Sequence, residues 1–126
     1  MNDPTTTRQI LTAKEALALM QEAAARGEIE LDLRGRELEN LCLCESILPV
    51  SLDLSFSIIH GAIWLSRSTL KGAYIKFDGA TIKGFVSMNG IKSDKPYDLS
   101  FRGTILHKEI HIENTAQFQV ISIACF

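Results

Sequence analysis

The sequence predicts an all-β solenoid of short strands, preceded by one α-helix, in a chain of 126 residues. Large apolar residues recur along the chain at steps of 11 to 13 residues. A period of this length is typical of a solenoid, in which each short unit stacks on the one before and the core lies between neighbours. The eight recurring positions are Leu43, Leu54, Leu65, Phe77, Met88, Leu99, Ile112 and Ile123.

Within each unit, two apolar residues two positions apart are followed by turn residues and then by a single apolar residue. Ile75 and Phe77, for example, precede Asp78 and Gly79, and Ile82 follows. Residues two apart on a strand point to the same side, and Ser, Asp or Asn beside a small residue favours a tight corner. One inward residue every five or six positions does not fit an amphipathic helix, whose apolar residues recur every three or four.

Three glycines lie just past the single apolar position of their units, where the chain needs a second corner. They are Gly61, Gly72 and Gly84. The three prolines, at positions 4, 49 and 96, leave the predicted strands uninterrupted. We therefore expect short strands joined by tight corners around a narrow apolar axis.

Three segments of the chain resemble the pentapeptide-repeat proteins, and in particular a divergent branch of that family with 11-residue units. They are residues 54–58 (Leu-Ser-Phe-Ser-Ile), 77–82 (Phe-Asp-Gly-Ala-Thr-Ile) and 102–105 (Arg-Gly-Thr-Ile). The resemblance covers roughly residues 29–126 and is clearest over 52–91. It implies that the solenoid is a right-handed, four-sided β-helix.

The N-terminal segment contains a helix signal. Thr12 and Glu15 have the spacing of a capping box, in which each side chain bonds a free backbone N–H of the other residue. We expect a helix from about Ala13 to Arg26 that ends at Gly27. Residues 1–11 are polar, and we expect a frayed arm rather than a targeting signal, because no apolar run follows a basic segment.

The predicted helix is amphipathic, and its apolar side chains fall on one face. They are Ala13, Leu17, Met20 and Ala24. We expect this face to cover the first turn of the solenoid, since the terminal units of a repeat array need a cap. The chain then divides into an arm with a capping helix over residues 1–28 and a solenoid over residues 29–126.

The start of the predicted solenoid admits a second interpretation. Leu31, Leu33, Leu38 and Leu41 are spaced as in the opening of a leucine-rich repeat. That family has a period of about 20–29 residues. No such leucine pattern continues beyond this segment, so the leucine-rich repeat ranks behind the β-helix.

The C-terminal end differs from the N-terminal end because residues 117–126 carry no charge and end on an aromatic residue. A bare strand edge with apolar neighbours pairs with other chains unless something covers it. Some pentapeptide-repeat proteins dimerise through their C-terminal ends, and the resemblance implies the same here. We expect a second copy in an end-to-end dimer or polymer, with contacts through Phe118, Ile121, Ile123 and Phe126. Two alternatives stay open: the end receives a different protein, or the chain is a fragment of a longer one.

Two side-face contacts are also predicted. Trp64 alternates with Ile63 and Leu65 and should point outward, and Trp is enriched at binding hot spots. Residues 92–96 (Lys-Ser-Asp-Lys-Pro) form a loop that leaves the rod, and Tyr97 follows it. Loops on rigid scaffolds often hold recognition residues, so Tyr97 is the second predicted side-face contact.

The charge balance argues against direct nucleic-acid binding. The net charge of −2 divides into −4 over residues 1–49 and +2 over residues 50–126. Neither half is the basic footprint of a nucleic-acid binder. A topoisomerase-directed DNA mimic, known in the pentapeptide-repeat family, remains an alternative; it would need a negative stripe along the solenoid, which the +2 balance disfavours. We expect neither a nucleic acid nor a membrane as a direct partner.

Cysteine usage favours a reduced, cytoplasmic setting, because three cysteines are present without a signal peptide: Cys42, Cys44 and Cys125. A zinc site near Cys42 and Cys44 would need further Cys or His, and the sequence offers none nearby. Four alternating residues form another metal candidate, since on one strand they would share the outer face: His107, Glu109, His111 and Glu113. A solvated polar face is the preferred interpretation, and metal binding is the alternative.

The sequence predicts no enzyme and no cofactor. It contains no Walker motif, no nucleophile elbow and no dinucleotide-binding GxGxxG unit. His60 lies at a predicted corner and has no carboxylate partner nearby in the sequence. The leading prediction is thus a non-enzymatic interaction or assembly module that associates through its C-terminal end.

Overall fold

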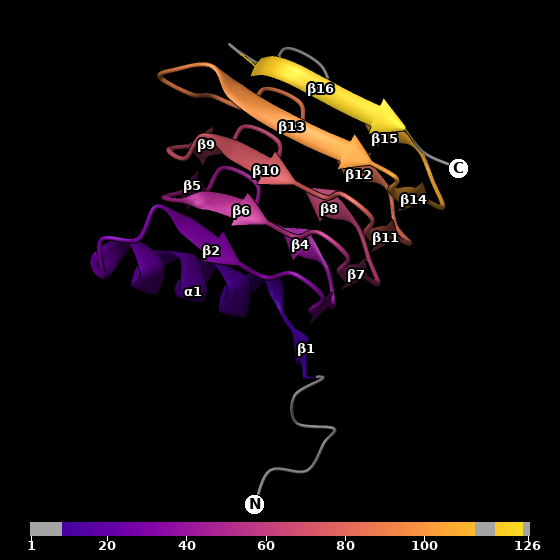
Figure 1. Cartoon of the computed structure of the whole chain (residues 1–126), viewed down its shortest axis with the longest axis horizontal. Helices are drawn as coiled ribbons and strands as arrows, with labels where there is room; N and C mark the ends of the chain where they lie inside the picture. Colours follow the sequence, from indigo (N-terminus) through magenta and orange to yellow (C-terminus); the bar gives the residue numbers. More distant parts are fainter. Residues whose placement is uncertain (1–8, 113–117, 125–126) are drawn as a thin grey trace, which may run out of the picture.

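The chain passes through four parallel sheets in a fixed order, turn after turn (Figure 1). This computed structural model describes residues 9–112 and, for the backbone, residues 118–124. All pairings between its strands are parallel, and the partners come from successive turns. The described chain is therefore an all-β, solenoid-like stack with one helix, as the spacing of its apolar residues predicts.

Successive strands visit the sheets in the order B, A, C, D, although only the first two turns place a strand in sheet D. Sheet A contains β1 (Ile10–Leu11), β3 (Glu37–Leu38), β7 (Ile58–Ile59), β11 (Thr81–Ile82) and β14 (Ile105–Leu106). Sheet B contains β2 (Glu30–Asp32), β6 (Ser51–Asp53), β10 (Tyr74–Lys76), β13 (Tyr97–Arg102) and β16 (Phe118–Ala124). Sheet C contains β4 (Leu41–Cys42), β8 (Ile63–Trp64), β12 (Val86–Ser87) and β15 (Ile110–His111). Sheet D contains β5 (Ile47–Leu48) and β9 (Thr69–Leu70), and Lys92 continues it by a bridge to Thr69.

One full turn holds two of the 11-residue units. In sheet B, Leu31, Leu52, Ile75 and Leu99 are stacked partners, separated by 21, 23 and 24 residues. The recurring apolar positions therefore alternate between sheets B and C. Leu99 pairs with Ile75 rather than with Phe77, and the ring of Phe101 stacks on Phe77 instead, with centroids 5.1 Å apart.

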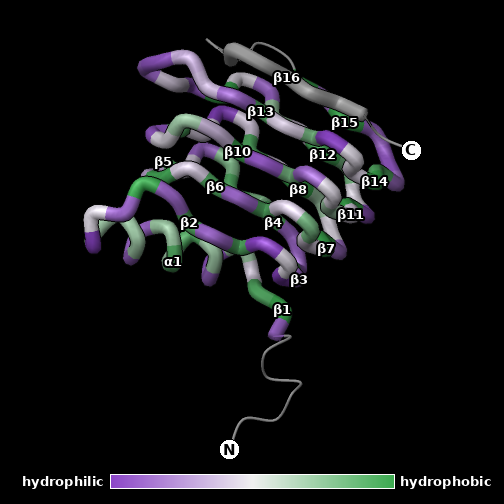
Figure 2. Tube along the Cα trace, viewed as in Figure 1, coloured by the Kyte–Doolittle hydropathy of each residue, from purple (hydrophilic) through white to green (hydrophobic). Residues whose placement is uncertain are grey.

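The core is a narrow column that receives one or two inward side chains between successive corners. Segments in sheets A and D present chiefly one, such as Leu38 and Leu48. Segments in sheets B and C present two that lie two positions apart, such as Leu52 with Leu54, because alternate residues of an extended chain point to the same side. Figure 2 shows the result, with hydrophilic and hydrophobic stretches alternating within each turn.

The corners that follow sheets B and C use left-handed backbone. Gly35, Gly79, Gly90 and Gly103 have positive φ angles there, as glycine readily does. Three corresponding corners hold other residues in the same conformation: Glu45 (φ 59°), Phe56 (φ 62°) and Arg67 (φ 57°). A side chain in this region costs about 1–2 kcal/mol, so these corners store strain.

Replacing Arg67 by glycine should release part of that strain. We expect Arg67→Gly to raise the free energy of unfolding by about 1 kcal/mol, because the left-handed penalty exceeds the entropy cost of glycine. The Arg67 side chain is 67% exposed and forms an ion pair with Glu45 at 3.3 Å, an interaction that contributes little at a surface. Arg67→Ala is the matched control, since it removes the same contact but keeps a Cβ. Urea unfolding of both variants checks this, and equal stabilities would contradict it.

The predicted N-terminal helix is present as α1 (Ala13–Ala25). Its capping box is complete: the Thr12 N–H donates to Glu15 Oε1 at 2.9 Å, and the Glu15 N–H donates to Thr12 Oγ1 at 3.1 Å. Arg26 is the C-cap, and Gly27 follows with φ of +79°. The predicted boundaries and the capping residues are therefore confirmed.

Helix α1 lies across the first turn and contacts β2, β4 and β5 (Figure 1). Ala16, Met20 and Ala23, on the inner face of the helix, are fully buried. The other positions of the predicted stripe, Ala13, Leu17 and Ala24, are partly buried against the same core. The helix is thus the cap of the first turn, as its apolar face predicts.

The prediction of a frayed arm over residues 1–11 is wrong for its last two residues. Ile10 and Leu11 form β1, which pairs in parallel with Glu37 and Leu38 of β3. Leu11 is 5% exposed and belongs to the core. An added strand satisfies the edge of sheet A, which α1 leaves uncovered, and this explains why the short segment is ordered.

Candidate functional site

The C-terminal end of the stack is built differently from the capped end. Within the described residues, β14, β15 and β16 are the last strands of sheets A, C and B, and each has a partner on one side only. All three belong to the last turn (Figure 1). Each outer edge therefore presents backbone N–H and C=O groups that can pair with another strand.

Burial along the stacked apolar columns changes at this last turn. Ile82, Val86 and Met88 are fully buried one turn below. In the last turn, Leu106 is the register partner of Ile82 and Ile110 that of Val86, and both are only partly buried. Ile105, the register partner of Thr81, lies beside this column and is 45% exposed. The axis of the solenoid, closed by α1 at one end, is therefore less covered at the other.

Three of the four predicted interface residues lie on the backbone of β16. Ile121 is in register with Leu99 and Ile123 with Phe101, and Phe118 is paired with Tyr97 at the start of the strand. Phe126 lies outside the described residues, as do Glu113 and Cys125. The chain thus brings the predicted β16 residues to the last turn, next to the exposed edges of β14 and β15.

The outward orientation predicted for Trp64 agrees with its side-chain exposure of 45%. Its ring meets Phe85 of the next turn edge-on, with centroids 5.8 Å apart. A shallow hollow of about 430 Å³ adjoins it, lined by Trp64, Ser66, Arg67, Ser87, Asn89 and Gly90. Sheet C therefore carries an aromatic patch on its outer face, at some distance along the stack from the last turn.

The prediction of Tyr97 as a surface contact is wrong. Its side chain is 1% exposed, because Tyr97 begins β13 and alternates inward with Leu99 and Phe101. The loop before it does leave the rod, and within it Asp94 forms an ion pair with Lys71 of the previous turn at 3.6 Å. Recognition by this loop would thus depend on its charged residues and not on Tyr97.

The predicted row of His and Glu side chains on one strand is also not observed. Strand β15 contains only Ile110 and His111, and His107 lies in the corner that follows β14. His111 Nε2 lies 2.8 Å from Glu109 Oε2, so these two side chains pair with each other. Among the described residues, no group of three or more His, Cys, Asp or Glu side chains is placed to hold a metal ion.

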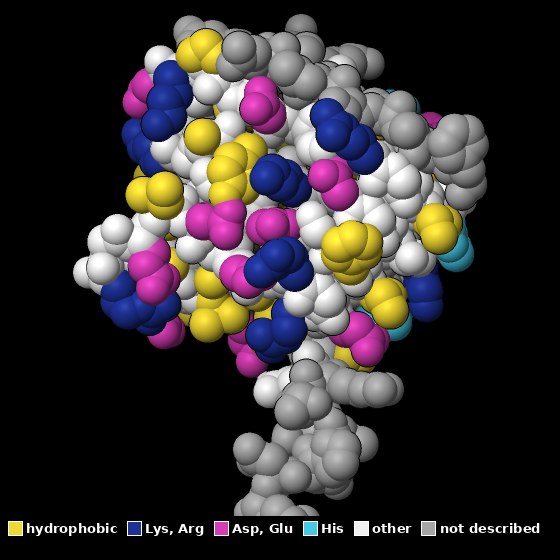
Figure 3. All heavy atoms as spheres, in the orientation of Figure 1, with side chains coloured by type: hydrophobic (Ala, Val, Ile, Leu, Met, Phe, Trp, Pro, Cys, Tyr) yellow, Lys and Arg dark blue, Asp and Glu magenta, His cyan; other side chains and the backbone are white. Residues whose placement is uncertain are grey.

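The outer face of sheet B carries charges of both signs. Figure 3 shows acidic and basic side chains interspersed over this face, with apolar side chains between them. Asp98 and Arg102 lie on the same strand, and Lys76 Nζ lies 4.6 Å from the centre of the Tyr74 ring. The described residues of this face do not form the single-signed stripe that DNA mimicry requires.

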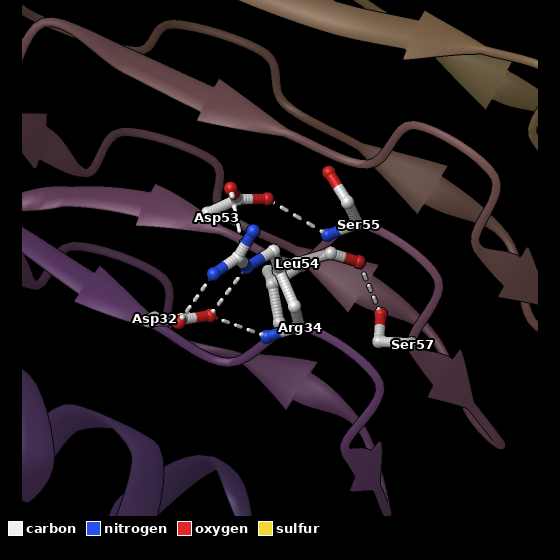
Figure 4. Close-up of polar contacts among 6 residues, drawn as sticks. All are labelled: Asp32, Arg34, Asp53, Leu54, Ser55 and Ser57. Carbon is white, nitrogen blue, oxygen red and sulfur yellow. Dashed lines mark hydrogen bonds and ion pairs between the residues drawn. The ribbon is translucent and has the colours of Figure 1, made fainter.

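On this face, the Arg34 side chain forms ion pairs with carboxylates of two neighbouring turns (Figure 4). Arg34 Nε lies 3.0 Å from Asp32 Oδ1 and 4.0 Å from Asp53 Oδ2, and the Asp53 carboxylate also accepts from the Ser55 N–H. Hydrogen bonds from the Arg34 side chain hold the pKa of the Asp32 carboxyl below its usual range. Asp32 and Arg34 are exposed and Asp53 is largely covered by this pairing, and the three groups form a surface ion-pair network between turns.

His60 has a partner that its local sequence does not reveal. Its Nε2 lies 2.8 Å from Glu37 Oε1, which belongs to the previous turn, and Lys83 Nζ of the next turn lies 3.5 Å from its Nδ1. The three residues follow one another at 23 positions, within the 21 to 24 residues that separate register partners in successive turns. Recognising this array therefore requires the turn length, which the sequence alone does not reveal.

No protein-family model, curated protein or solved structure matches the chain in the comparisons. Within the part of the chain that the structure describes, no helix combines the length and apolarity needed to cross a bilayer.

Proposed function

We propose that this chain is a non-enzymatic assembly module that binds a second copy of itself through its C-terminal turn. The observation that carries the proposal is the contrast in burial between Val86, which is fully buried, and Ile110, its partly buried register partner in the last turn. Covering the exposed part of this apolar column contributes about 25 cal/mol for each square ångström removed from water.

A second copy is the occupant that fits the three edges best. Strands β14, β15 and β16 lie on three sides of the same turn, and a single partner strand could pair with only one of them. The C-terminal turn of a second copy presents the same three strand edges. A pair related by a two-fold axis can therefore form backbone hydrogen bonds along several of these edges at once. The helical cap at the other end limits such a pairing to one interface per chain.

The proposed architecture is a right-handed, four-sided β-helix of the pentapeptide-repeat type. Parallel crossovers within a sheet are right-handed in about 98% of cases, which supports the handedness. Successive strands that visit four sheets, with a corner about every five residues, support the four-sided form. Trp64 is proposed as an additional contact on the side of this rod, because it combines exposure with a large apolar surface.

The proposal predicts that a charge at the rim of the last turn disrupts association. Ile105→Asp should convert a dimer into a monomer, because a two-fold pair would bring two added carboxylates to one interface. Light scattering after size exclusion, over a range of concentrations, measures the mass. Ile121→Asp and Ile123→Asp should act in the same direction, but their register with buried Leu99 and Phe101 makes a folding control necessary.

Ile47→Asp is the matched control, since Ile47 is 59% exposed and lies in β5 of the first turn. It introduces the same charge at a similarly exposed position and should leave the dimer intact. A parent chain that is monomeric at all concentrations would refute the proposal. Equal loss of the dimer in both variants would place the interface elsewhere.

A further inference from the structure

Two free thiols lie side by side on the outer face of sheet C, away from the proposed interface. Cys42 and Cys44 are both exposed, whereas Leu41 and Leu43, which alternate with them, are buried. Residues two apart on an extended segment project to the same side. The chain therefore presents a dithiol pair from a single short segment.

Both thiols lean towards the neighbouring strand in the same direction. Cys42 Sγ lies 3.9 Å from the Ala62 carbonyl oxygen, and Cys44 Sγ lies 3.5 Å from that of Trp64. These two carbonyls are themselves two residues apart, so they hold the thiols roughly parallel. Neither sulfur is buried in the core, and both remain accessible from one side.

The spacing of this pair suits a bridging ion better than a disulfide. Two residues of extended chain span about 6.6 Å, and parallel side chains keep their Cβ atoms about that far apart. A disulfide requires Cβ atoms only about 3.5–4.5 Å apart. Two metal–thiolate bonds of about 2.3 Å, arranged in line, span about 4.6 Å between sulfurs, which a small tilt of both side chains provides.

The number of ligands selects the class of ion. Zinc in proteins takes about four ligands, and the described residues offer no third Cys, His or carboxylate at this place. Soft thiolates favour Cu⁺, and Cu⁺ and Ag⁺ accept two ligands in line. We propose that Cys42 and Cys44 form a two-thiolate site for a soft monovalent cation, Cu⁺ or Ag⁺.

Binding exchanges protons for the cation and involves no redox step. Each thiol loses its proton to solvent, each sulfur forms one bond to the cation, and the product is a bis-thiolate complex with one negative charge. Because a thiol must lose its proton to bind the cation, uptake releases protons and strengthens as the pH rises.

The test uses the full chain carrying Cys125→Ser, so that only the two thiols of the pair remain. Ag⁺, and separately Cu⁺ presented as its bicinchoninate complex without oxygen, is titrated against the protein. Trp64 is the single tryptophan of the sequence and is the register partner of Cys42, so a bound heavy cation should quench its fluorescence. We expect one cation per chain, with quenching complete at that ratio.

Single variants give the sharpest comparison. Cys42→Ser and Cys44→Ser should each take up at most half a cation per chain, since one thiolate can complete the pair only by joining two chains. The double variant should take up none and keep the parent circular dichroism spectrum. Uptake of one cation per chain by the double variant, or by either single variant, would overturn the proposal. So would failure of the parent to remove Cu⁺ from the competitor.

Discussion

Gly84→Ala should lower the free energy of unfolding by about 3 kcal/mol, although it adds only one methyl group. A Cβ at this position would lie 2.5 Å from the backbone nitrogen of Ala62 and would also overlap the backbone of Gly61. Gly61 and Ala62 belong to the turn below, and the Gly84 N–H donates a hydrogen bond to the Gly61 carbonyl oxygen at 3.0 Å. Backbone cannot rotate away as a side chain can, so the added methyl forces successive turns apart.

Gly103→Ala separates this effect from the conformational cost of replacing glycine. Gly103 has φ of +64°, and nothing lies within 4 Å of an added Cβ, so only the left-handed penalty of about 1–2 kcal/mol applies. Gly84 has the opposite combination, with a close backbone neighbour and no positive φ. Urea unfolding of the two variants compares the costs. A smaller loss for Gly84→Ala than for Gly103→Ala would mean that the turns are not in backbone contact.

The glycines illustrate what a repeat pattern reveals and what it leaves out. Their positions predict corners, and Gly61, Gly72 and Gly84 do lie at corners. Glycine is needed at these corners for close contact between turns and not for a left-handed backbone. A Cβ at Gly72, for example, would lie 2.5 Å from the Val50 carbonyl carbon. Close approach between turns is a long-range property, and a local sequence pattern contains no information about which backbone lies above it.

Patterns formed by residues close together in the sequence predict local structure most accurately. The capping box depends on residues three positions apart, so Thr12 and Glu15 predict the start of α1 correctly. The number of residues in a full turn is known only from pairings between distant strands, such as that of Leu52 with Ile75. The 11-residue period is compatible with one unit or two in each turn, and only the pairing distinguishes them. For the same reason the contact between Glu37 and His60 was not predicted.

Two predictions that the structure contradicts also conflict with patterns in the sequence itself. Tyr97, Leu99 and Phe101 alternate with polar residues, a clear strand pattern that places Tyr97 inside rather than in the preceding loop. A row of His and Glu side chains around His107 requires one continuous strand. The spacing of about five residues between corners instead places a corner there. For the proposed interface, the sequence predicts an uncharged, apolar C-terminal segment, and the half-covered column at Leu106 and Ile110 adds the physical reason for association.

Phe101→Ala should lower the free energy of unfolding by about 3–5 kcal/mol. Phe101 is fully buried, stacks on Phe77, and lies in β13, which carries β16 on its other side. The stability of a solenoid is close to a sum of contacts between neighbouring turns, so a cavity at this position weakens chiefly the last turn. Since that turn is the proposed interface, self-association should weaken as well.

Leu38→Ala provides the comparison at the opposite end of the stack. Leu38 is fully buried in the first turn, and its loss should cost about 2–5 kcal/mol, similar to that of Phe101. If association takes place at the C-terminal turn, Leu38→Ala lowers stability and leaves the dimer intact, whereas Phe101→Ala lowers both. Urea unfolding and sedimentation at matched concentrations, under conditions in which both variants remain folded, measure the two quantities. Equal weakening of the dimer would show that association follows global stability, and the exposed end would then have no special role in it.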